Sequence, residues 1–202
     1  MHENFGLVRA IERLLLRGKL DEARNFARAI AISPDEVGLT AWATHAARVR
    51  DRAAELANAT SLDDAIRREA QLASECASCH VDTGVMPDFS SPPPVPPDRP
   101  FLEVRMARHR WAADRLWEGM VGMADDSWRA GLDVLAATPL PAAELGENRQ
   151  ALATKLQRQA TNARVARSAD RLADRATAYG EMLATCAACH TSTTNRVPDV
   201  KP

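Results

Sequence analysis

The segment LADRATAYGEMLATCAACH, residues 172–190, determines the fold class. Apolar residues recur in it at the i, i+4 and i+7 spacing that marks one face of a helix: Leu172, Ala176, Tyr179, Leu183 and Cys186. The segment ends in Cys-x-x-Cys-His, and the same pattern ends a second helical segment at residues 76–80. No part of the chain alternates apolar and polar residues as a strand does. The sequence therefore predicts an all-α protein.

The composition agrees with a helical chain, and the charge argues against nucleic acid or a membrane surface as partner. Of the 202 residues, 38 are Ala, the best helix former, and only 4% are aromatic. The 26 Lys and Arg nearly balance the 27 Asp and Glu, so no charge of one sign would attract nucleic acid or an anionic membrane surface. No apolar run approaches the ~18 residues of a membrane span. We therefore expect no nucleic-acid partner and no membrane span.

A proline-rich stretch divides the chain into two halves. Seven of the twelve prolines lie within residues 87–100. Proline lacks the backbone donor and fixes φ, so this stretch is predicted to be an extended linker. It separates a first unit, 1–86, from a second unit, 101–202.

The two halves read as a diverged internal repeat. The two Cys-x-x-Cys-His patterns align at an offset of 110 residues, whereas Asp21 and Arg24 align with Asp126 and Arg129 at an offset of 105. The change of offset predicts a longer loop in the second half, near residues 139–148. Each half reads as four helices, of which the fourth ends in the cysteine pattern.

Two helix starts in the first half can be read from capping residues. Ser33-Pro34-Asp35-Glu36 has the cap, first-turn proline and acidic third residue of a helix start, so we expect the third helix to run from there to about Asn58. Thr60-Ser61 is expected to precede the fourth helix.

The chemistry lies in Cys76-Ala77-Ser78-Cys79-His80 and Cys186-Ala187-Ala188-Cys189-His190. Two thiols three residues apart on a helical turn can each bond one vinyl group of the same porphyrin, and the adjacent His then ligates the iron. The motifs therefore predict two covalently bound c-type haems, with His80 and His190 as iron ligands. A zinc site built from the two cysteine pairs and a pair of redox dithiols are the alternatives. The His that follows both pairs favours haem.

A Cys-x-x-Cys-His at the end of the fourth helix of an all-helical unit resembles the cytochrome c-prime and low-spin four-helix-bundle cytochrome c family. The chain resembles two such units in tandem, which together would form a dihaem cytochrome c. The resemblance implies two four-helix bundles joined by the proline-rich linker. It also implies that a sixth iron ligand, where one exists, comes from the N-terminal part of the first helix of each unit; in c-prime itself the iron stays five-coordinate.

Candidates for this sixth ligand differ between the halves. In the second half His109 is expected to ligate, with Met106, one turn earlier, as the alternative. In the first half we rank His2 first, then His45, then an open or Met-ligated iron. Met86 is disfavoured because it lies only six residues after His80 and its path around the haem edge would be strained.

The expected function is that of a dihaem c-type cytochrome which carries single electrons between redox partner proteins and is not an enzyme. A gas-binding haem sensor or carrier for nitric oxide or carbon monoxide is the alternative, and a dihaem peroxidase is the least favoured. Since haem is attached to such motifs outside the cytoplasm, we expect a periplasmic or otherwise exported protein. Residues 1–13 hold acids at Glu3 and Glu12 and no apolar block of signal-peptide length, so we expect that any export signal has been removed or was never there.

Overall fold

The computed structural model describes residues 2–34, 42–89, 92–165 and 171–192. The described residues form helices and no strand, which confirms the predicted all-α fold. The α-helices are α1 (His2–Leu16), α2 (Leu20–Ala31), α3 (Ala43–Ala57), α4 (Leu62–Thr83), α5 (Leu102–Val121), α6 (Asp125–Ala137), α7 (Glu147–Val165) and α8 (Leu172–Thr191). A short 3-10 helix, η2 (Ala142–Glu144), lies in the loop between α6 and α7, where the sequence predicted a longer connection.

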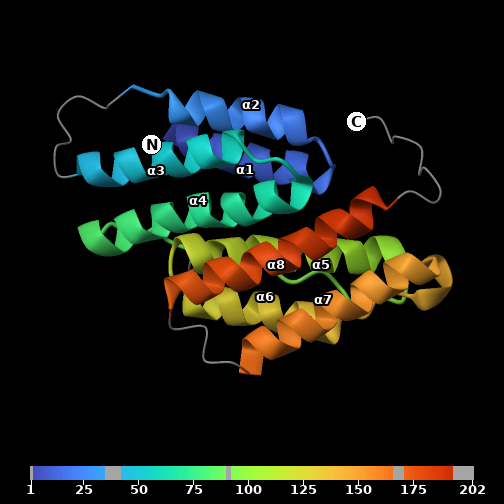
Figure 1. Cartoon of the computed structure of the whole chain (residues 1–202). Coiled ribbons are helices and arrows are strands. Elements are labelled where there is room, and N and C mark those ends of the chain that lie inside the picture. Colours follow the sequence, from blue (N-terminus) through green and yellow to red (C-terminus); the bar gives the residue numbers. More distant parts are fainter. Residues whose placement is uncertain (1, 35–41, 90–91, 166–170, 193–202) are drawn as a thin grey trace.

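Helices that follow one another in the chain pack together, α1 to α4 on one side and α5 to α8 on the other. The two groups meet along α4 and α8, which lie side by side in the middle of the molecule (Figure 1). These two helices run in opposite directions, so their C-terminal ends lie at opposite ends of the pair. Near the middle of the pair the contact is close, because a Cβ on Gly180 would stand 3.2 Å from the Cβ of Ala70.

The start of α4 follows the capping prediction, whereas that of α3 does not. The Ser61 hydroxyl accepts a hydrogen bond from the Asp64 N–H at 3.1 Å and caps α4, as expected. Ser33 instead donates its hydroxyl to the Ile30 carbonyl at 2.8 Å, so it closes the end of α2. Pro34 is outside any helix, and α3 is described from Ala43 onward. Asp35 and Glu36, which belonged to the predicted helix start, lie outside the described residues.

One continuous hydrophobic core runs through both groups of helices. Leu72 and Leu116, from different halves of the chain, are both buried within it. Its largest side chains include Trp128, which is fully buried on α6. At Gly119 the backbones of α5 and α6 come so close that a Cβ would lie 2.6 Å from the backbone nitrogen of Trp128. This contact needs a residue without a side chain.

The described part of the proline-rich stretch is non-helical and largely exposed. Two side chains of α5 bind its backbone: the Trp111 indole N–H donates to the Pro93 carbonyl at 2.8 Å, and Arg108 donates to the Pro96 carbonyl at 2.5 Å. The stretch therefore lies against α5.

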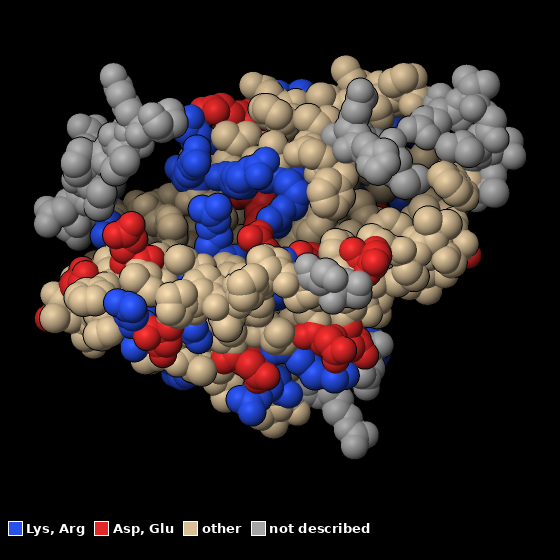
Figure 2. Space-filling model, turned by 180° about the vertical axis from the view of Figure 1, so that it is seen from behind, with Lys and Arg blue, Asp and Glu red and all other residues tan. Residues whose placement is uncertain are grey.

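The face seen from behind carries basic and acidic side chains side by side, and basic side chains gather around a hollow between the two layers of helices (Figure 2). Among the described residues, no helix has the length and apolar character needed to cross a membrane.

Candidate functional site

The two Cys-x-x-Cys-His motifs occupy the last turns of α4 and α8. Cysteines three residues apart on a helix share one face, so both sulfurs of each motif project to the same side. The four thiols are free of disulfides. Gly84, with a φ of +71°, takes the left-handed conformation that ends α4 just after the first motif. Each motif is therefore presented on a helix end.

His80 is held by the other half of the chain. Its Nδ1 lies 2.9 Å from the Val121 carbonyl oxygen at the end of α5. A carbonyl can only accept, so Nδ1 carries a proton, and Nε2 is the nitrogen left to bind a metal. Histidines that ligate metals are typically oriented in this way, by a bond from the second ring nitrogen to a carbonyl or carboxylate. The first motif thus offers an imidazole that the other half of the chain orients.

The other candidate residues of the first half are placed differently. His45 is buried on α3, where its Nδ1 accepts from Arg48 at 2.8 Å and its Nε2 lies 3.5 Å from an Asp82 oxygen. Both ring nitrogens of His45 are therefore engaged beside the first motif. Met86 is exposed after the end of α4. His2 belongs to α1, but its side chain lies outside what the structure describes.

The second motif has an arginine beside it. Arg149 of α7 donates to the Ser192 carbonyl at 3.1 Å, just beyond the motif. Partial desolvation of the ring, together with this nearby positive charge, lowers the pKa of His190 below its ordinary value. The first motif has a comparable neighbour, since Arg48 of α3 is close enough for its charge to act on the Cys79 sulfur. Neither arginine was singled out in the sequence, because only the fold places the third helix of each half beside its motif.

His109 lies two turns into α5 and is buried, with 7% of the residue exposed. Its Nε2 donates to the Thr138 carbonyl at 2.9 Å, so Nδ1 is the nitrogen with a free lone pair. Burial lowers the pKa of His109; the hydrogen bond to the Thr138 carbonyl opposes this, whereas the charges of Arg105 and His190 add to it. The structure thus brings His109 to the end of the molecule that holds the second motif. Met106 is half-buried and Arg110 is exposed.

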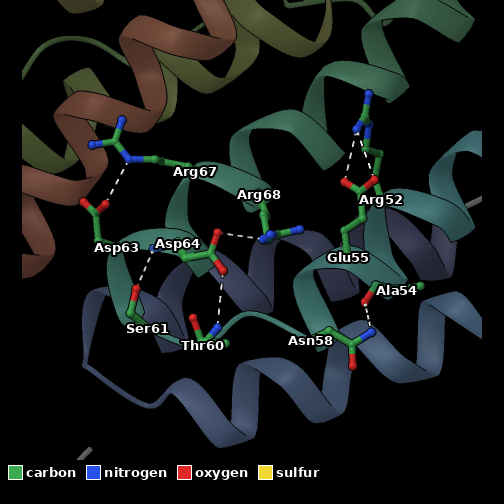
Figure 3. A network of polar contacts seen from close by, with 10 residues as sticks. All are labelled: Arg52, Ala54, Glu55, Asn58, Thr60, Ser61, Asp63, Asp64, Arg67 and Arg68. Atoms are coloured by element: carbon green, nitrogen blue, oxygen red, sulfur yellow. Dashed lines mark hydrogen bonds and ion pairs between the residues drawn. The ribbon is translucent and has the colours of Figure 1, made fainter.

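Three arginines on the two motif helices bind other side chains and main-chain groups. Arg67 and Arg68 pair with the carboxylates one turn before them, at 2.9 Å from Asp63 and 2.7 Å from Asp64 (Figure 3). Arg175 of α8 is fully buried, where it stands 5.6 Å from the centre of the Trp128 ring and donates to the Gly119 carbonyl at the α5–α6 contact. These side chains stabilise the helices and the core.

The pKa values and the positions of the cysteine thiols argue against the two alternatives to haem, redox dithiols and a shared zinc ion. Desolvation, followed by the neighbouring cysteine of the same motif, raises the pKa of the Cys76 and Cys186 thiols to about 12. Redox-active dithiols typically have a lowered thiol pKa. Since α4 and α8 are antiparallel, the two cysteine pairs also stand at opposite ends of the pair of helices. They are not arranged to share one tetrahedral zinc ion.

No protein-family model, no curated protein and no solved structure matches the chain. The motifs and their geometry therefore carry the functional conclusion.

Proposed function

We propose that the protein is a dihaem c-type cytochrome that carries single electrons between redox partner proteins in an exported compartment. The observation that carries the proposal is the orientation of His80: its Nδ1 donates to the Val121 carbonyl while Nε2 stays available, at the end of a Cys-x-x-Cys-His helix. A simple thiol pair would not need a histidine fixed in this state.

The residues present fit a covalently bound haem at each motif. Cys76 and Cys79 would hold one porphyrin through thioether bonds, and His80 would ligate its iron; the second motif would do the same through the residues Cys186, Cys189 and His190. The bound group supplies a reversible one-electron change at iron. The chain orients the ligands, and it places the positive charges of Arg48 and Arg149 beside the two motifs.

The proposed cytochrome consists of two four-helix units, 1–86 and 101–202, joined by the linker 87–100 and related by an approximate two-fold axis. Two contacts between the halves support this. Arg9 pairs with Asp114, 105 residues later, and Ala70 faces Gly180, 110 residues later. These separations equal the two offsets at which the halves of the sequence align. In a two-fold interface, equivalent residues meet each other at the axis.

His109 is the proposed sixth ligand of the second iron, with Met106 as the alternative. Its burial and its position near His190 support this role. In the first unit His2 is the proposed sixth ligand, since both nitrogens of His45 are bound to charged partners. An open first site would favour the gas-binding alternative.

Haem content tests the proposal. The intact mass of protein produced with a haem-attachment system should exceed that of the bare chain by two haems, and the haems should resist acid–acetone extraction because thioether bonds hold them. Replacing both Cys76 and Cys79 with Ala should remove one haem and leave the second. A colourless protein, or one that contains zinc in place of haem, would contradict the proposal. The optical spectrum of the ferrous protein separates electron carriage, with both irons six-coordinate, from gas binding at an open iron.

A further inference from the structure

A buried carboxyl without a partner lies between the two motifs. Glu69 of α4 is fully buried, and neither of its carboxyl oxygens has a hydrogen-bond partner. Glu12 of α1 is 4% exposed, and Tyr179 of α8 is 2% exposed. The charge of Glu12 acts on both Glu69 and Tyr179, so the three groups lie together where their helices meet.

The positive charge of Arg9 acts on Glu69, but the hydrogen bonds of Arg9 go to Glu12 and to Asp114. The Arg9 guanidinium binds Glu12 and also Asp114 of α5, and it stands 4.7 Å from the centre of the Trp117 ring. The ionisable groups that face the cluster are Arg9, Glu12 and Arg13 from α1, Tyr179 from α8 and Asp114 from α5. An ionised carboxylate buried without a paired charge or hydrogen bond is strongly disfavoured. Burial, followed by the charge of Glu12, raises the pKa of Glu69 well above its ordinary value.

The cluster is within electrostatic reach of both motifs. Glu69 and Cys76 are seven residues apart, two turns along one face of α4, and Tyr179 and Cys186 have the same relation on α8. The charge of Glu69 acts on the Cys76 sulfur, and that of Glu12 acts on the Cys186 sulfur. A change of charge at either motif therefore changes the electrostatic potential at Glu69 and Glu12.

We propose that Glu69 binds the proton that accompanies the first of the two reductions: it takes up one proton when the first electron arrives at either motif and releases it when that electron leaves. The inference rests on the proposed function. In that reduction a one-electron donor protein supplies the electron, and solvent supplies the one proton that converts the Glu69 carboxylate to the neutral acid. Oxidation by a one-electron acceptor reverses both transfers. Arg9 pairs both with Glu12, whose charge acts on Glu69, and with Asp114, whose side chain is 40% exposed.

Redox titration of the haem-loaded protein at a series of pH values tests this role. Over the range in which Glu69 titrates, the reduction potential should fall with rising pH by up to about 59 mV per pH unit, the value for a tenfold change in a one-electron couple. The variant Glu69→Gln keeps the shape of the side chain but cannot exchange a proton. The dependence of the reduction potential on pH should therefore be lost in this variant. The control Glu22→Gln, on α2, removes a carboxylate whose side chain is 54% exposed, and it should keep the wild-type dependence. Equal pH dependence in wild type and Glu69→Gln overturns the inference.

Two further measurements keep the test decisive if Glu69→Gln folds poorly or carries no haem. Infrared difference spectra of the wild type should show the carbonyl band of a protonated carboxyl appearing on reduction, and their failure to show it overturns the inference.

The second measurement is the free energy of unfolding of Glu69→Gln relative to wild type. Because folding raises the pKa of Glu69, the stability provided by its neutral form is complete below the ordinary carboxyl value of 4.5 and is lost as pH rises through the folded-state pKa. The free energy of unfolding of Glu69→Gln should therefore increase relative to that of wild type as pH rises. A difference that does not change with pH contradicts a raised pKa of Glu69 in the folded protein. A chain without haem contradicts the proposed function instead.

Discussion

His80 and His109 have one feature in common at the level of single atoms. Each imidazole donates from one nitrogen to a main-chain carbonyl, of Val121 and of Thr138 respectively, which leaves the other nitrogen to bind a metal. The sequence identified both histidines as candidates, but it could not indicate which nitrogen would be free. That choice depends on carbonyls 41 and 29 residues away along the chain. Only the fold brings them within hydrogen-bonding distance.

Replacing His109 with Ala should change one of the two proposed haems. If this imidazole ligates the second iron, its loss opens a coordination position, so about half of the haem should become high-spin and bind carbon monoxide. The potential of that haem should rise, because a nitrogen donor that favours ferric iron has been removed. Optical spectra and redox titration measure both effects.

Met106→Ala is the matched control for this experiment. It lies one turn earlier on the same helix and should leave both spectra unchanged if His109 is the ligand. The reverse result, in which His109→Ala leaves the spectra unchanged and Met106→Ala changes them, would make Met106 the sixth ligand. If neither replacement has an effect, the second iron is five-coordinate and the gas-binding alternative becomes the better one.

At the level of helices, the periodic segments were easier to predict than the connections. The motif helices α4 and α8 end at Thr83 and Thr191, as the position of the cysteine patterns indicated. The Ser33 cap was misread because a Ser hydroxyl can bind a carbonyl behind it as readily as an N–H ahead of it. Arg175 is fully buried, although its charge and its helical setting are typical of a surface residue. Its place depends on Trp128 and Asp125 of α6, which the local pattern does not reveal.

Gly119→Ala should destabilise the contact between α5 and α6. The added Cβ would lie 2.6 Å from the Trp128 backbone nitrogen, so the helices would have to separate, at a cost of about 1–3 kcal/mol. Gly6→Ala is the matched control on α1, since its Cβ would meet nothing within 4 Å. It should stabilise the chain by up to about 1 kcal/mol through helix propensity. Urea unfolding measures both changes, and equal effects of the two replacements would contradict the close α5–α6 contact.

In the whole molecule, the two motifs lie at opposite ends of the α4–α8 pair. His80 and His190 are each ten residues beyond the central contact of Ala70 with Gly180, in opposite directions. At 1.5 Å per residue they stand about 30 Å apart along the pair. In the proposed cytochrome, electrons would therefore enter and leave at separate faces, while one core joins the halves.

This shared core predicts that the chain unfolds in one transition. Far-ultraviolet circular dichroism reports all helices, whereas three of the four Trp residues belong to α5 and α6, so fluorescence mainly reports the second half. Urea curves from the two signals should coincide. Gly180→Leu would force a large side chain against Ala70, where a Cβ alone would already stand 3.2 Å away, and should separate the two curves. Separate transitions in the wild type would show that the halves fold independently.

The bond from His80 to the Val121 carbonyl also has a consequence for the order in which the protein is made. Synthesis runs from the N-terminus, so the first motif is complete 41 residues before the carbonyl that orients its histidine has been added. The face of α4 that packs on α8 stays uncovered for longer still, until the last helix arrives. The first half of the nascent chain therefore reaches its final form only when the second half closes over it, and an enzyme that modifies Cys76 and Cys79 would meet them while that face is still open.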